Sequence, residues 1–62
     1  MCESRVYLDS DGKRESIMNS VIVVRPEDDG SIFLANLLGE QKVVRAKVKE
    51  IKLLEHKIIL EA

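Results

Sequence analysis

The only cysteine of this 62-residue chain is its second residue, so the one thiol follows directly on Met1. The thiolate is the form of cysteine that binds metal ions. At position 2 the sulfur lies beside the chain's amine, and together they offer nitrogen and sulfur donors to one metal ion. If Met1 is retained, its amine, the deprotonated amide of Cys2 and the sulfur are the ligands. If Met1 is removed, the amine and sulfur of Cys2 close a small chelate ring.

The donors of one chain do not fill the coordination sphere of a metal ion. Two chains related by a twofold axis would supply twice as many donor atoms. Thiolates and nitrogen donors in a plane suit Ni(II) or Cu(II), whereas Zn(II) prefers a tetrahedron. Met1 and Cys2 are therefore the candidate metal ligands, shared between the chains of a homodimer. An incidental thiol at the chain end is the alternative that the residues leave open.

The other residue types that carry catalytic chemistry are scarce. The single histidine, His56, lies in "LLEHKIIL", a polar break between apolar runs, and we expect it in an exposed turn. A nucleophilic pair would require Cys2 and His56 to meet in space, which the spacing does not indicate. The three glycines are isolated and form no phosphate-binding loop. We expect no enzymatic activity.

Length and composition indicate one domain, residues 1–62, that needs support beyond its own core. A chain this short buries only about 60% of its unfolded surface, and one cysteine excludes an internal disulfide. A metal or a second copy would stabilise it. No apolar run reaches the roughly 18 residues of a membrane helix. The polar sequence after Tyr7 lacks the apolar stretch of a secretory signal, so we expect a cytoplasmic protein without a membrane partner.

Turn signals divide the chain at short intervals. Asp11-Gly12, Asp29-Gly30 and Gly39 lie between apolar runs that are rich in β-branched residues. The runs are "SRVYL", "SVIVV", "SIFLANL", "KVVRAKVKEI" and "KIILE". This spacing predicts an all-β domain, a small sandwich or barrel of about five to six short antiparallel strands.

Two details of the predicted strands can be read from the apolar pattern. Apolar and basic residues alternate from Val44 to Val48, which indicates one buried and one wet face. The apolar positions then shift by one at Ile51 and Leu53, as they do at a β-bulge. Pro26 should end the Val-rich strand before it, because proline cannot donate to a ladder. "ANLLGEQ" could contain one helical turn.

The C-terminal third of the chain is basic, which raises RNA binding as a second hypothesis. Residues 41–62 carry three acidic and six basic side chains. The basic ones are Lys42, Arg45, Lys47, Lys49, Lys52 and Lys57. An Sm-like or OB-like module could bind RNA through this stripe, but it normally adds stacking aromatic residues. Tyr7 and Phe33 lie inside apolar runs, where we expect them to pack in the core. We therefore favour a solvated basic face without a nucleic-acid partner.

Three stretches together resemble the CooT family of small nickel-binding proteins: "MCESRVYL", "VIVVRPEDDGSIFLANLLGE" and "VRAKVKEIKLLEHKIILE". The specific element is Met1-Cys2 before an otherwise cysteine-free β-domain. The resemblance implies a small SH3-like or Sm-like barrel that forms a homodimer, with one Ni(II) held at the interface by Cys2 of both chains. It also implies delivery of nickel to a maturing nickel enzyme or its maturation factors. No His-rich tail is present, so bulk storage of nickel is not expected.

Overall fold

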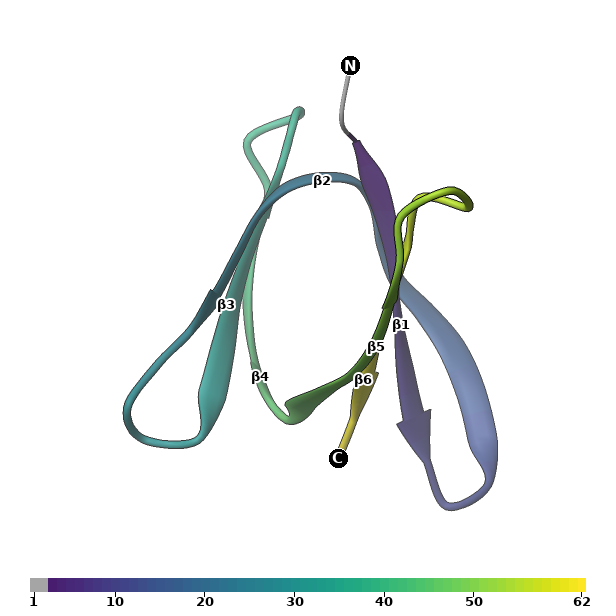
Figure 1. Ribbon diagram of the computed structural model, residues 1–62. Coiled ribbons are helices and arrows are strands. Elements are labelled where there is room, and N and C mark those ends of the chain that lie inside the picture. Colours follow the sequence, from purple (N-terminus) through teal and green to yellow (C-terminus); the bar gives the residue numbers. More distant parts are fainter. Residues whose placement is uncertain (1–2) are drawn as a thin grey trace.

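The computed structural model describes residues 3–62, which form one curled sheet with the strand order β4-β3-β2-β1-β6-β5 (Figure 1). All neighbours are antiparallel except β1 and β6, which are parallel. The strands are β1 (Ser4–Ser10), β2 (Lys13–Pro26), β3 (Ser31–Asn36), β4 (Gln41–Arg45), β5 (Lys47–Lys52) and β6 (Lys57–Glu61). The all-β prediction is confirmed, with six strands in this part of the chain.

The predicted turns are confirmed at all three glycines. Asp11 and Gly12 join β1 to β2, the turn before Ser31 contains Gly30, and Gly39 lies between β3 and β4. Gly30 and Gly39 have φ angles of 86° and 85°. Side chains rarely adopt this left-handed region, and glycine enters it without steric cost. The segment with a possible helical turn forms this β3–β4 turn instead.

Strand β2 is longer than the Val-rich run predicted. It ends at Pro26 as expected, but it also includes the polar segment that begins at Lys13. Strand β2 bends along its length (Figure 1), and Ser20, with φ of 55°, lies near its middle in the sequence. The half before the bend pairs with β1 and the half after it pairs with β3. The first half of β2 was not predicted from the sequence, because its side chains are mostly exposed and polar.

The run "KVVRAKVKEI" forms two strands that are separated at Ala46. Strand β4 pairs with β3 and strand β5 pairs with β6, at opposite edges of the sheet. A register shift between Val48 and Glu50 confirms the predicted bulge. Val44 and Ala46 pack against the core, whereas Val48 is 39% exposed. The alternation therefore indicated the inner face correctly, but its burial decreases along β5.

The sheet is open, so the closed SH3-like or Sm-like barrel is not confirmed. Strands β4 and β5 are consecutive in the chain, yet no ladder joins them among the described residues. Both edges carry lysines, such as Lys42 on β4 and Lys49 on β5. Charged side chains on an unpaired edge oppose strand pairing.

The apolar core lies inside the curl of the sheet. Its buried members come from four strands: Val6, Met18, Val21, Ile32, Leu34 and Leu60. Ile59 is 1% exposed but pairs with Tyr7, and alternation places both on the opposite face from Val6 and Leu60. The parallel ladder from Arg5–Lys57 to Asp9–Glu61 fixes the position of β1 and β6 relative to each other.

The aromatic residues are not core residues, which corrects the prediction. Tyr7 and Phe33 are only half-buried. The guanidinium of Arg25 lies 4.6 Å from the ring centre of Phe33, and the Lys57 amine lies 5.9 Å from that of Tyr7. Both rings therefore lie on the outer faces of strands, beneath cationic side chains.

No helix in residues 3–62 is long and apolar enough to cross a membrane.

Candidate functional site

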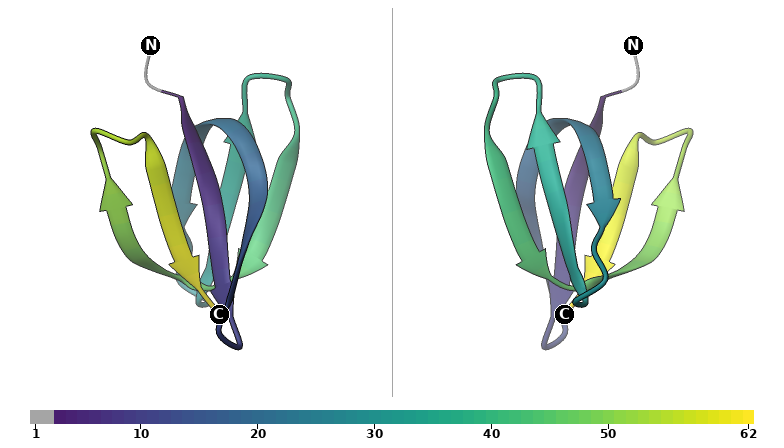
Figure 2. Two further views of the ribbon diagram at one scale, coloured as in Figure 1. Left: turned by 90° about the vertical axis from the view of Figure 1, so that its right-hand side faces the viewer. Right: turned by 90° about the vertical axis from the view of Figure 1, so that its left-hand side faces the viewer.

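The strands and their connections define two ends of the molecule (Figure 2). The amino end contains the start of β1, the β3–β4 turn at residues 37–40 and the β5–β6 turn at residues 53–56. The opposite end contains the β1–β2 and β2–β3 turns, the junction at Ala46 and the C-terminal Ala62. The predicted metal ligands, Met1 and Cys2, lie outside the described residues. The described chain begins beside them at Glu3, at the amino end.

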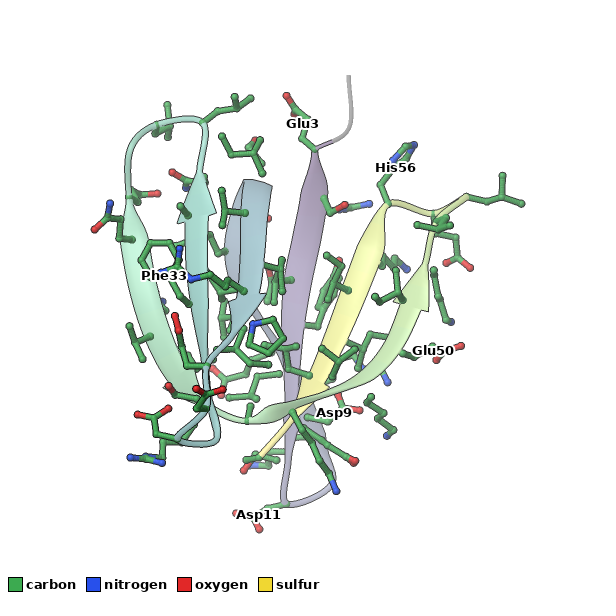
Figure 3. The ribbon with its side chains drawn as sticks, turned by 60° about the vertical axis from the view of Figure 1, so that its left-hand side comes forward. Glu3, Asp9, Asp11, Phe33, Glu50 and His56 are labelled. Carbon is green, nitrogen blue, oxygen red and sulfur yellow. The ribbon has the colours of Figure 1, made fainter. Side chains whose placement is uncertain are left out.

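The start of β1 is anchored by hydrogen bonds and by apolar burial. The Arg5 amide donates to the carbonyl of His56 over 2.9 Å, and Val6, completely buried, pairs with Ile58 on β6. Glu3 and His56 consequently lie at the same end of the molecule (Figure 3). His56 is exposed in the β5–β6 turn, as the sequence predicted. Whether it meets Cys2 falls outside the described residues.

The β3–β4 turn is held by one buried polar side chain, Asn36, which is 5% exposed. Its Oδ1 accepts hydrogen bonds from the amides of Leu38 and Glu40, at 3.1 and 2.9 Å. Its Nδ2 donates to the Glu40 carboxylate over 2.6 Å. The Leu37 amide donates to the Ser20 carbonyl on β2. This turn is therefore ordered, although Leu37 and Leu38 are 48% and 81% exposed.

The β5–β6 turn also combines defined backbone geometry with exposed leucines. The His56 amide donates to the Leu53 carbonyl over 3.3 Å, and His56 has a φ of 55°. Lys57 pairs with Glu55 at 3.4 Å. Leu53 and Leu54 are 80% and 98% exposed. The sequence analysis did not identify these leucines as functional candidates, although two adjacent leucines in each of two turns were the available signal.

The described residues do not form a complete metal site of their own. Within residues 3–62, no three histidine, cysteine, aspartate or glutamate side chains are grouped closely enough to hold a metal ion. His56 and Glu3 are the potential ligands that Figure 3 places at the amino end. The hypothesis that Met1 and Cys2 bind the metal remains a prediction.

At the opposite end, the carboxylate of Asp9 pairs with two cationic side chains. Asp9 accepts hydrogen bonds from Arg14, at 2.7 and 3.0 Å, and from Lys49 at 2.9 Å. These bonds, that of Arg14 foremost, hold the pKa of Asp9 well below its usual range. An open hollow of about 730 Å³ borders this cluster and is lined by both acids and bases. It lies at the end of the sheet opposite to the start of β1 (Figure 2).

Most members of the predicted basic stripe are engaged within the fold. The contacts are Lys42 Nζ to the Ile17 carbonyl at 3.1 Å, Arg45 to the Asp29 carbonyl at 2.7 Å, Lys49 to Asp9 at 2.9 Å and Lys57 to Glu55 at 3.4 Å. The two aromatic rings lie beneath cations. Nothing in residues 3–62 therefore resembles a row of free aromatic side chains on which bases stack.

Comparison with known proteins decides the family. The family model described as CO dehydrogenase accessory protein CooT matches residues 1–61. The chain belongs to the CooT family. A crystal structure assigned to CooT in Carboxydothermus hydrogenoformans is similar to this chain, with 33% sequence identity and a TM-score of 0.86. The match covers 97% of this chain and 95% of that one. No curated protein matches the chain significantly. The family comprises accessory proteins, so the prediction that this chain is not an enzyme is confirmed.

Proposed function

We propose that this protein is a homodimeric Ni(II)-binding protein in which Met1 and Cys2 of both chains hold one metal ion at the dimer interface. The observation that carries the proposal is the match to the CooT family from residue 1 onward, which includes Met1 and Cys2. The donor chemistry supports it, because an amine, an amide nitrogen and a thiolate form the set that favours planar Ni(II).

The proposed role is delivery of nickel during the maturation of a nickel enzyme in the cytoplasm. The family description names CO dehydrogenase, so that enzyme and its maturation factors are the first clients to test. Residues 1–62 would act as one domain. The anchoring of β1 from Arg5 onward supports this role, since it sets the chain that follows the ligands on a rigid sheet.

Anaerobic titration of the reduced protein with Ni(II) tests the proposal directly. We expect one Ni(II) per two chains and an absorption band from thiolate-to-metal charge transfer. Cys2→Ser should retain the fold and lose at least about 100-fold in nickel affinity, more than the loss of an outer-sphere partner. The hydroxyl of serine does not ionise near neutral pH and is a poor ligand for Ni(II). Unchanged nickel binding by Cys2→Ser would refute the assignment of the ligand.

The RNA-binding alternative is separated by a salt titration. Affinity for RNA falls steeply as salt rises, because phosphate contacts release counterions. Binding of a metal by thiolates lacks that dependence. Tight RNA binding with a steep salt slope, together with no nickel uptake by the reduced protein, would replace the nickel proposal with the RNA one.

A further inference from the structure

The sheet ends on two edge strands, β4 and β5, whose outer backbone groups have no ladder partner among residues 3–62 (Figure 2). On β4, the long basic side chains bind main-chain groups elsewhere in the fold. Lys42 donates to the Ile17 carbonyl over 3.1 Å, and Arg45 donates to the Asp29 carbonyl over 2.7 Å. Strand β4 is therefore largely engaged within the fold, apart from Val43, which is 65% exposed.

The inner face of β5 is apolar and incompletely covered. Val48 pairs with Leu60, and Ile51 pairs with Ile58 on β6. Residues directly opposite each other in a ladder share a face of the sheet. Leu60 is a core residue and Ile58 packs against the core, so Val48 and Ile51 face the inside of the curl. They are nevertheless 39% and 54% exposed, which leaves apolar surface on the core side of this edge in contact with water.

The outer face of β5 carries lysines, and one of them has an unfavourable neighbour. Lys47 lies opposite Glu61, and Lys52 lies opposite Lys57 on β6. Like charges directly opposite each other in a ladder are destabilising. Among the described residues, Lys57 pairs with Glu55, whereas Lys52 forms no ion pair. A carboxylate on the open side of β5, opposite Lys52, would compensate this cation.

We infer that the open edge of β5 is a docking site for an extended segment of a partner protein in which acidic and apolar residues alternate. Such a segment adds a strand to the sheet, and main-chain hydrogen bonds supply part of the affinity. Its apolar side chains cover Val48 and Ile51, and its acidic side chains lie opposite Lys47 and Lys52. Because the bulge of β5 lies between Val48 and Glu50, the expected order is acidic, apolar, any residue, apolar, acidic. The inference goes beyond the proposed function and makes no use of nickel.

The charge of β5 decides between the candidate occupants of this edge. A second copy that added its own β4 or β5 would bring basic residues opposite basic residues, and edge lysines are a common protection against such pairing. An acidic segment gains from the same lysines, so the edge discriminates between the two. Single-stranded RNA binds through stacked rings as well as phosphates, and β5, with the sequence KVKEIK, contains no aromatic residue. An acidic protein segment is therefore the occupant that matches both faces of the strand.

The test uses capped synthetic peptides and the reduced, metal-free protein. In one peptide valine alternates with glutamate, and in the control peptide valine alternates with lysine. Titration followed by NMR should show that the acidic peptide binds at least about tenfold more tightly, because each cross-strand charge pair changes from repulsive to attractive. Amides within residues 47–52 should also become protected from hydrogen exchange, which attraction between charges alone does not produce.

Four variants locate the binding. Lys52→Glu is compatible with the fold, because the new carboxylate lies opposite Lys57. It should lower the affinity for the acidic peptide by about three- to tenfold and raise that for the basic peptide. The matched control is Lys13→Glu, which makes the same change of net charge at an exposed residue of β2 and should leave both affinities unchanged. Ile51→Thr, which keeps a β-branched side chain, should weaken binding of the acidic peptide, whereas Val43→Thr on the other edge should not.

The outcomes separate this inference from the proposed function. Equal affinity for the two peptides, no protection within β5, or an effect of Lys13→Glu as large as that of Lys52→Glu would overturn the docking edge. Tighter binding of a uridine oligonucleotide than of the acidic peptide at Lys52 would also overturn it and would identify the lysines as phosphate ligands. These results leave the nickel proposal as it stands, because Ni(II) titration tests that proposal separately. A protein that binds the acidic peptide along β5 but takes up no Ni(II) supports the docking edge and refutes the proposed function.

Discussion

The two ends of this sheet use the same kind of connection, tight turns between antiparallel strands, but they expose different chemistry. The opposite end exposes carboxylates and bases in contact with one another, as Asp9 is with Arg14 and Lys49. The amino end exposes four leucines on turns that Asn36 and His56 hold in place. At the opposite end, both Asp9 and Asp29 pair with cationic side chains of the same chain.

The comparison shows which features the fold requires and which it does not. A tight turn requires residues that tolerate a positive φ, such as Gly39 or the residue at position 56. The remaining turn positions are free to be polar, as they are at the opposite end. Leucine side chains at these positions leave apolar surface exposed to water. The exposed apolar surface of the amino end is therefore not a requirement of its turns.

The largest expected difference between the ends concerns extension of the chain. A tag before Met1 replaces the terminal amine with an amide and crowds the place where two chains would converge. We expect nickel affinity to fall by at least about 100-fold, as for loss of a ligand. A tag of the same sequence after Ala62, without histidine, should leave binding unchanged. Titration of both tagged proteins with Ni(II) measures the difference. Equal nickel affinity would show that the terminal amine is not a ligand.

The next largest effect concerns the turns themselves. Asn36→Ala removes the acceptor for the Leu38 and Glu40 amides and should lower the free energy of unfolding by about 1–3 kcal/mol, the usual cost of unsatisfied buried groups. Asp29→Ala removes the acceptor for the Ser31 amide and hydroxyl at the opposite end, but the Asp29 side chain is 63% exposed, so water can replace it and the change should cost less. Urea denaturation measures both. A larger loss for Asp29→Ala would mean that the opposite end is the more rigid one.

A smaller effect, dependent on pH, is expected for the ion pairs at the opposite end. Because Arg14 and Lys49 lower the folded-state pKa of Asp9 below its unfolded value, the ionised carboxylate stabilises the fold above the unfolded pKa. This contribution begins to decrease as pH falls below about 4, the unfolded pKa, and is lost only as pH falls further through the lower folded-state pKa. Asp9→Asn should lower the melting temperature by a few degrees at pH 7 and by less at pH 3.

The control for the Asp9 experiment is Asp11→Asn, which removes an exposed carboxylate two residues away in the β1–β2 turn. Asparagine tolerates the left-handed conformation of Asp11, whose φ is 53°. Its melting temperature should follow that of the wild type at both pH values. A destabilisation by Asp9→Asn that is the same at pH 3 and pH 7 would argue against the ion pairs as its cause.

The smallest effect is expected for His56, although it lies at the amino end. His56→Asn keeps a residue that tolerates a φ of 55° and removes the imidazole. Nickel affinity should change by less than about tenfold, below the usual range even for an outer-sphere partner of a metal. Competition with a chelator measures this change. A loss as large as that of Cys2→Ser would make His56 a ligand and extend the site to the β5–β6 turn.

The sequence alone determined the elements whose causes are local. Glycine at positive φ fixed the turns, Pro26 ended β2, and the shift of apolar positions after Val48 marked the bulge. The exposed position of His56 followed from the polar break around it. The candidate ligands, Met1 and Cys2, also came from sequence, because their chemistry depends on covalent position along the chain.

Only the tertiary structure decided what depends on residues far apart in the chain. Strands β4 and β5, continuous in sequence, separate at Ala46 because their hydrogen-bonding partners, β3 and β6, lie on opposite sides of the sheet. Tyr7 and Phe33 lie in apolar stretches of the sequence and were therefore expected in the core. In the sheet they lie instead on the outer faces of their strands, beneath cationic side chains. The leucine pairs are 16 residues apart in sequence. They come to one end because the strand directions place both turns beside the start of β1.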